Sequence, residues 1–214
     1  MTFTGWPRSA IPFFEGLEAD NSRDYWQAHK SVYDGDVRAP IEALTADLAA
    51  EFGPAVLFRP YRDVRFSADK SPYKTQVAAV LGDTGDGAYY LQLSADGLMT
   101  GAGLHVMTPD QVARLRAAID EERSGAALES IVARLRDTGF EQGGDSLKTA
   151  PRGVGKDHPR IGLLRYRSCF VLRHHRPAGW LHTAKARDVV REDWLAARPL
   201  VDWLHEHVGP SAAP

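Results

Sequence analysis

The sequence contains little cysteine and no long apolar run. Its 214 residues include a single cysteine, Cys169, which excludes an intrachain disulfide and fits a reducing compartment. Cys169 lies in an apolar stretch, so we expect a buried thiol rather than a nucleophile. No segment approaches the ~20 apolar residues of a membrane-spanning helix. The start, MTFTGWPRSAIPFF, lacks the basic and apolar regions of a signal peptide. We therefore expect a soluble, cytoplasmic protein with no membrane partner.

The motifs of several common catalytic and cofactor-binding classes are also missing. The chain has no G-x-S-x-G elbow, no phosphate-binding P-loop and no H-E-x-x-H pair. The glycine-rich run at 82–87 lacks the lysine and the following helix of a phosphate loop, so it predicts an ordinary turn. His205 and His207 are two residues apart and would lie on different faces of a helix, which makes them a poor metal pair. We expect neither a metal nor a cofactor.

The charge of the chain is distributed unevenly. The net charge is only −2, yet residues 58–76 carry five basic and two acidic side chains, a net of +3. Residues 147–176 carry eight basic and one acidic side chain, a net of +7, which leaves −12 on the remainder. Two basic segments this far apart in sequence can converge on one anionic partner. We predict that they meet around one cavity.

The first basic segment is the centre of the predicted site. It reads RPYRDVRFSADKSPYKT over residues 59–75, with aromatic rings among the cations. Alternation predicts a strand over 58–66, and the turn-rich part at 67–75 predicts a loop that could hold a ligand. Arg62 breaks the alternation and needs a carboxylate, carbonyls or an anion as partner. The predicted ligand-binding residues are Arg59, Arg62, Arg65, Ser67, Lys70, Tyr73 and Lys74, joined by Lys148, Arg152 and Arg165 of the second segment.

Two residues are weak candidates for proton transfer, Asp63 and His158. His158 precedes Pro159, and an imidazole is the side chain best suited to proton transfer near neutral pH. It is equally consistent with a turn histidine that bonds to the backbone. The arginine and aspartate row around Asp63 is equally consistent with surface ion pairs. Whether the protein is an enzyme stays open at this point.

Periodicity and turn residues predict an α+β protein. The expected helices span 11–19, a segment capped by Asn21 or Ser22, 41–52, 109–122, 126–137, 158–168 and 187–208, the last with a break near Pro199. Their spacing predicts a shared buried face for Trp26 and Tyr33, and it predicts core positions for Val112, Leu115, Ile119, Leu128, Ile131, Leu135, Val190, Trp194, Leu200, Trp203 and Leu204. The expected strands span 58–66, 76–81, 89–94, 98–106 and 169–173, and the turn at 95–97 predicts an antiparallel hairpin. We expect a single domain over residues 1–209, with a mainly antiparallel sheet of about five strands packed by N-terminal, central and C-terminal helices. Residues 210–214 are expected to form a disordered tail.

Several motifs in the same order as in a known family extend across most of the chain. Besides the segment at 59–75 they are NSRDYWQAHKSVY (21–33), YLQLSADGLMTGAG (90–103), LKTAPRG (147–153), HPRIGLLRYRS (158–168) and RPLVDWL (198–204). Together they resemble the domain-of-unknown-function 2461 family of bacteria and fungi. The resemblance supports the fold and the boundaries. It implies no activity, cofactor or catalytic residue.

Three functional hypotheses follow from the sequence. The first is a protein that binds a small anion, such as a phosphorylated or carboxylated metabolite, in a basic pocket. The second is nucleic-acid binding, with Tyr61, Phe66 and Tyr73 stacking on bases while cations contact phosphates. The third is a scaffold or interaction protein without catalytic activity, in which the arginines and aspartates form only a structural network.

Overall fold

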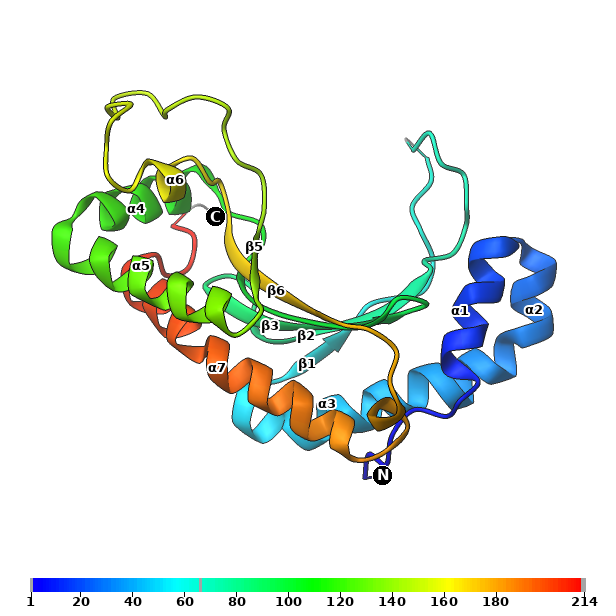
Figure 1. The fold of residues 1–214 in the computed structure, drawn as a ribbon. Helices are drawn as coiled ribbons and strands as arrows, with labels where there is room; N and C mark the ends of the chain where they lie inside the picture. Colours follow the sequence, from blue (N-terminus) through cyan, green and yellow to red (C-terminus); the bar gives the residue numbers. More distant parts are fainter. Residues whose placement is uncertain (1, 66, 213–214) are drawn as a thin grey trace. The chain divides into compact units, whose positions relative to one another are not determined.

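The computed structural model describes residues 2–65 and 67–212, which form an α+β fold with one antiparallel sheet (Figure 1). The helices are α1 (Ala10–Ala19), α2 (Arg23–Val32), α3 (Ala39–Phe52), α4 (Pro109–Asp120), α5 (Glu122–Asp137), α6 (Ile161–Leu164) and α7 (Lys185–His207). A π-helical turn η1 (Tyr33–Arg38) joins α2 to α3, and a 3-10 turn η2 (Gly179–His182) precedes α7. The strands are β1 (Ala55–Leu57), β2 (Gln76–Asp83), β3 (Gly87–Ser94), β4 (Gly97–Leu104), β5 (Glu141–Gly143) and β6 (Cys169–His175). The predicted fold class is confirmed.

The described part of the sheet has six strands in the order β1-β2-β3-β4-β6-β5. The first four are neighbours in sequence as well as in space. The turn between β3 and β4 consists of Ala95 and Asp96, and Gly97 follows it with a φ of +106°. A side chain there would lie 2.3 Å from the carbonyl oxygen of His175, so glycine is required both by the backbone angle and by the space. The predicted hairpin is confirmed.

The chain divides into two compact units. Unit 1 consists of Met1–Leu81, Tyr90–Thr100 and His174–Glu192, and unit 2 of Gly82–Tyr89, Gly101–Arg173 and Asp193–Pro214. The first predicted basic segment therefore belongs to unit 1. Nearly all of the second, up to Arg173, belongs to unit 2.

The core of unit 1 is aromatic and lies among its N-terminal helices. Trp26 and Tyr33, predicted to share a buried helix face, are 1% and 3% exposed, and their ring centroids lie 4.7 Å apart. Phe13 of α1 packs edge-on against Trp26 at 6.0 Å. Ser22 caps α2 by accepting a hydrogen bond from the backbone N–H of Tyr25, which confirms one of the two predicted caps. The core fixes the position of α2, whose first residues contact the basic segment.

The core of unit 2 is formed by α4, α5 and the C-terminal part of α7. Predicted apolar positions are buried there: Leu115, Ile119, Leu128, Ile131, Leu135, Trp194, Leu200, Trp203 and Leu204. The indole N–H of Trp203 donates to the carbonyl of Ser124 at 3.0 Å. Ser211 and the backbone N–H of Ala212 bond to Asp110. Among the described residues, no helix is both long and apolar enough to cross a membrane.

Three predicted elements are wrong in part. Residues 58–65 do not form a strand, because Pro60 lies opposite Lys74 and Pro72 opposite Arg62, and neither proline can return the hydrogen bond that its carbonyl accepts. Phe66 lies outside the described residues. Only α6 is α-helical within 158–168, since Arg167 leaves the helical path and its N–H bonds to the carbonyl of Asp145. Helix α7 continues through Pro199 without the predicted break.

Candidate anion-binding site

The described part of the first basic segment, residues 58–65 and 67–75, forms an irregular two-stranded ribbon, which we call the basic finger. It continues β1 and β2, from which it projects as a long cyan loop (Figure 1). The ladder pairs Leu57 with Ala79, and the next bridge pairs Tyr61 with Tyr73. Between these two pairs, the segment from Leu57 to Tyr61 advances four residues, whereas the segment from Tyr73 to Ala79 covers six. The two extra residues form a bulge, and beyond it the finger has a register of its own.

The base of the finger is held by side chains from α2 and the residues before it. Asn21 bonds to the backbone of Tyr73 twice: its Oδ1 accepts from the N–H at 3.0 Å and its Nδ2 donates to the carbonyl at 3.1 Å. The ring of Tyr73 stacks on the indole of Trp26, with centroids 4.3 Å apart and planes 6° from parallel. Tyr61 lies 5.6 Å from Tyr73. Tyr73, predicted as a ligand residue, is therefore only 5% exposed and anchors the finger.

Cations near the tip of the finger are neutralised within the loop. Arg62 pairs with Asp69, which supplies the carboxylate that the sequence demands for it. Arg65 pairs with Asp63 at 2.7 Å. The ammonium of Lys70 donates to the carbonyl of Val64 at 3.0 Å. These contacts maintain the shape of the tip and leave little free charge there.

Both carboxylates of the finger are stabilised in their ionised form. Hydrogen bonds from the backbone N–H and hydroxyl of Ser71, and then from Arg62, lower the pKa of Asp69 to about 2. Hydrogen bonds from the side chain and backbone of Arg65 lower the pKa of Asp63 from its ordinary value. A carboxylate with a lowered pKa is a weak base near neutral pH, so this environment does not favour Asp63 in proton transfer.

Arg59 and Lys74 near the base of the finger are different. Neither has an acidic partner within hydrogen-bonding distance among the described residues. The ammonium of Lys74 lies 5.4 Å from the centre of the Phe58 ring. Burial, and then the charge of Arg59, lower the pKa of Lys74 from its ordinary value. Phe58 and Tyr61 expose 37% and 49% of their surface on the same segment. The finger base, defined as Phe58, Arg59, Tyr61 and Lys74, is thus cationic and aromatic.

The second basic segment contains paired and unpaired cations. Arg160 is almost fully buried and bonds to Glu122 at 2.8 Å and Glu129 at 2.9 Å. Arg167 pairs with Asp145, and Arg173 pairs with the buried Asp193. These three arginines have structural partners in unit 2. The sequence did not predict those acids, which lie twenty or more residues from their arginines.

The predicted ligand residues of unit 2, Lys148, Arg152 and Arg165, have no carboxylate partner among the described residues. Lys148 and Arg152 are exposed. The Nε of Arg165 is buried and has no hydrogen-bond partner among the described residues. The backbone carbonyl of Arg165 accepts from the N–H of Leu147, the residue before Lys148, at 2.9 Å. Lys148 and Arg165 therefore lie on neighbouring parts of one ribbon.

His158 is held between two partners. Its Nδ1 accepts the backbone N–H of Arg160 at 3.0 Å, and its Nε2 lies 3.0 Å from a carboxylate oxygen of Asp120. With Nδ1 as acceptor, Nε2 carries the proton and donates to Asp120. Both ring nitrogens are thus occupied, as expected of a turn histidine that bonds to the backbone.

The structure brings Arg59, Tyr61, Tyr73 and Lys74 together in unit 1 and Lys148 with Arg165 in unit 2. Ser67 lies at the tip of the finger, where its backbone N–H bonds to the carbonyl of Val64. The convergence of both segments on one cavity stays a prediction, because they lie in different units. Sequence reasoning missed Asn21 as an anchor of the finger; its position just before the α2 cap pointed only to a helix start. No three His, Cys, Asp or Glu side chains gather to hold a metal within the described ranges.

Comparison with known proteins gives one match. Residues 9–203 match the model of a family described as "Conserved hypothetical protein (DUF2461)". Neither the search of curated proteins nor the search of solved structures finds a match. The family match covers the finger and both units, and its description names no ligand.

Proposed function

The chain belongs to the DUF2461 family, and because the description of that family names no activity, we propose from the geometry that the protein binds a small anionic ligand at the finger base. The ligand carries a phosphate or carboxylate group together with a flat apolar part. Its charged group contacts Arg59 and Lys74, and its apolar part packs on Phe58 or Tyr61.

The observation that carries this proposal is the environment of Lys74. A half-buried ammonium beside a guanidinium, without a carboxylate partner, is a site where positive charge is poorly compensated. A bound anion would interact with both cations and would restore the pKa of Lys74 toward its ordinary value. Arg62 and Arg65 already face carboxylates, so we assign them to the shape of the finger rather than to the ligand.

The exposed rings define the apolar part of the ligand. Most aromatic side chains near the finger are buried, whereas Phe58 and Tyr61 remain exposed beside the free cations. An aromatic face next to a cation favours flat ligands, because stacking adds to the electrostatic attraction. Phenyl phosphate and nucleoside monophosphates combine a phosphate group with a flat ring, whereas inorganic phosphate has only the charged group.

The proposal is tested by anion-dependent thermal stabilisation. A ligand that binds only the folded state at a hundred times its dissociation constant adds ~2.7 kcal/mol, which is roughly 5–10 °C in Tm for a chain of this size. Phenyl phosphate should raise the Tm more than inorganic phosphate, and phosphate more than chloride at matched ionic strength. Phosphate also stabilises proteins generally by exclusion from their surface. The comparison must therefore be made against variants.

Matched variants come from the same finger. Arg59→Gln and Lys74→Met should each remove most of the increment with phenyl phosphate. Lys70→Met removes one positive charge as well, but its ammonium bonds to a tip carbonyl, so the increment should persist. If all three variants lose the Tm increment equally, the stabilisation comes from the general positive charge of the loop and not from a specific site. An unchanged increment in Arg59→Gln and Lys74→Met would refute the site.

Arg165 supports a similar assignment in unit 2. A buried guanidinium nitrogen without a partner leaves a strong donor unsatisfied. We propose that Arg165, with Lys148 and Arg152, also contacts an anion. Arg165→Met should then reduce stabilisation by phosphate, whereas Arg136→Met, an exposed arginine on α5, should not. Equal increments in both variants would leave Arg165 without a ligand role.

The second candidate function is binding of single-stranded nucleic acid. It is favoured by the exposed Phe58 and Tyr61 beside cations, because bases stack on aromatic rings while cations contact phosphates. Twelve-residue oligothymidylate at low salt tests it, since such binding weakens steeply as salt rises. Retention of phenyl phosphate binding without any oligonucleotide binding would leave the small anion as the ligand.

A further inference from the structure

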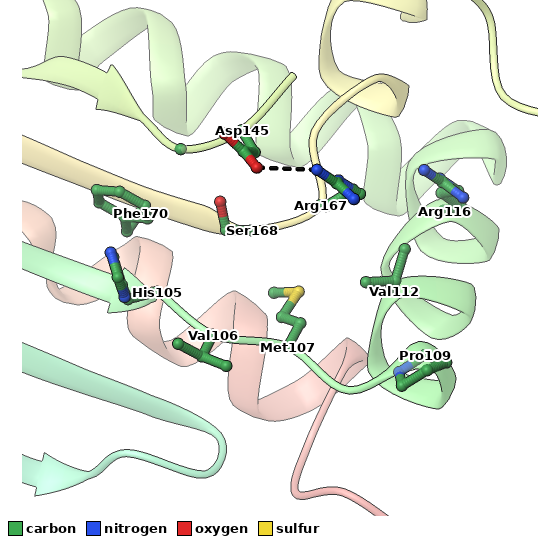
Figure 2. Close-up of a pocket in the computed structure, with 11 residues that line it drawn as sticks. His105, Val106, Met107, Pro109, Val112, Arg116, Asp145, Arg167, Ser168 and Phe170 are labelled. Carbon is green, nitrogen blue, oxygen red and sulfur yellow. Dashed lines mark hydrogen bonds and ion pairs between the residues drawn. The ribbon is translucent and has the colours of Figure 1, made fainter. Parts of the chain in front are cut away.

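Unit 2 contains an open hollow of about 870 Å³ whose lining includes none of the predicted ligand residues (Figure 2). Its volume is within the range of about 300–1,000 Å³ that is usual for small-molecule sites. Pro109, Val112 and Arg116 of α4 are spaced three and four residues apart, so they share one face of the helix. The remaining walls are segments 105–107 and 144–145 and the side chains of Arg167, Ser168 and Phe170.

Two polar groups of the hollow have capacity for a ligand. Ser168 is 5% exposed and lines the hollow, yet its hydroxyl has no hydrogen-bond partner among the described residues. Arg116 is oriented by a bond of 3.2 Å from its Nε to the carbonyl of Leu164, and within the described part it has no carboxylate partner. Arg167, by contrast, is paired with Asp145 at 2.8 Å. Figure 2 shows Arg116 and Ser168 on different sides of the hollow.

Gly144 provides the space around Ser168. It has a φ of +108°, and a side chain at this position would lie 2.0 Å from the hydroxyl oxygen of Ser168. Any other residue would therefore displace the hydroxyl. Because Gly144 has no side chain, its backbone can approach the hydroxyl of Ser168 closely.

Between the two polar groups the surface is apolar. Met107 extends into the space between Val112 and Ser168 (Figure 2). Phe170 packs against His105, with ring centroids 5.0 Å apart. Val112 was predicted to face the core with the other apolar positions of α4, but it is only half-buried because it lines the hollow. A thioether beside aliphatic and aromatic groups adapts to ligands of different shape.

We propose that this hollow is a second binding site, for a small molecule with an acidic group at one end, a compact apolar body and a hydrogen-bonding group at the other end. Arg116 binds the carboxylate or phosphate. The body packs on Met107, Val112 and Phe170, and the hydroxyl of Ser168 bonds to the distal polar group. This arrangement gives a ligand partner to both Arg116 and Ser168.

The test uses 3-(4-hydroxyphenyl)propanoate as the probe and two relatives that each lack one group. One relative, 3-phenylpropanoate, lacks the distal hydroxyl, and the other, 4-(3-hydroxypropyl)phenol, lacks the acid. Binding is followed by NMR of methionine labelled with ¹³C in the methyl group. The chain has three methionines, and Met107 lines the hollow whereas Met99 belongs to unit 1 and serves as the reference. Met107→Leu assigns the signal.

The complete probe should shift the Met107 signal in a saturable manner and leave Met99 unchanged. Loss of either end group should weaken binding by about tenfold, the effect of one good polar interaction. In Arg116→Gln the acid and the alcohol should bind alike, and Arg116→Lys should restore part of the preference. In Ser168→Ala the two acids should bind alike. Arg136→Gln, on the exposed surface of α5, should behave as the wild type.

Three outcomes overturn the proposal. The first is that no probe shifts the Met107 signal at concentrations up to about 10 mM. The free energy of binding would then be weaker than about 3 kcal/mol. The second is that Met99 and Met107 shift to the same extent. The third is that both variants keep the wild-type preferences while their spectra show a folded protein.

Discussion

Asn21 is the residue whose removal should most directly loosen the basic finger. Its amide makes two hydrogen bonds to the backbone of Tyr73, at 3.0 and 3.1 Å, and it is half-buried. Each such bond contributes about 0.5–1.5 kcal/mol net, so Asn21→Ala should lower the free energy of unfolding by about 1–3 kcal/mol. Asn21→Asp keeps the acceptor for the Tyr73 N–H but faces the Tyr73 carbonyl with an oxygen. It should therefore also destabilise the protein.

Urea denaturation measures the loss, and NMR locates it. Asn21 is the only asparagine of the chain, so labelling with [¹⁵N]asparagine gives one side-chain amide signal. Its protons should exchange slowly with water because one of them is bonded to the carbonyl of Tyr73. Tyr73→Phe is the control, since the bonds go to the backbone and the ring still stacks on Trp26. A loss below about 0.5 kcal/mol in Asn21→Ala, or fast exchange in the wild type, would refute this account of the anchor.

Two further predictions concern titratable groups in unit 2. Hydrogen bonds from Ser124, and then from the backbone of Arg123, lower the pKa of Glu121, the N-cap of α5, to about 2. The ionised Glu121 contributes fully to stability above the pKa of the unfolded state, near 4.5, and this contribution is lost as the pH falls through about 2. The urea midpoint of Glu121→Gln should therefore fall less over this pH range than that of the wild type. Parallel curves for the two proteins would contradict this account. Burial raises the pKa of Cys169 to about 12. The native thiol should therefore resist Ellman's reagent at about pH 8 and react fully in about 6 M guanidinium, and rapid reaction of the native protein would disprove the burial.

The elements predicted correctly are those with local causes. Ser22 caps α2, Pro109 begins α4 and Gly97 follows the β3–β4 turn, and each acts within a few residues of its own position. The strand predicted over 58–66 failed for a reason that local alternation cannot show. Pro60 and Pro72 come to lie opposite Lys74 and Arg62 only after the finger has closed, and each proline removes a donor from the ladder.

The candidate site was predictable in composition but not in detail. The excess of cations at 58–76 and 147–176 can be read from the sequence alone. Which cations remain free depends on acids placed by the fold. Arg160 bonds to Glu129, thirty-one residues away in sequence, whereas Lys74 lies over the ring of Phe58 and not beside a carboxylate. Periodicity also placed Val112 in the core, because a helix face that lines a hollow is as apolar as one that packs fully.

The division of the chain into interleaved units affects the order in which the protein can fold during synthesis. Unit 1 begins at the N-terminus, but its last segment is His174–Glu192, and unit 2 begins at Gly82 and ends with the chain. Neither unit can therefore be completed while the ribosome is still adding the first 170 or so residues. Part of the apolar surface of the N-terminal helices and the finger therefore stays exposed until His174–Glu192 has been synthesised. We infer that each unit stays incomplete, and open to chaperones, for longer during synthesis than a domain encoded by one continuous segment would.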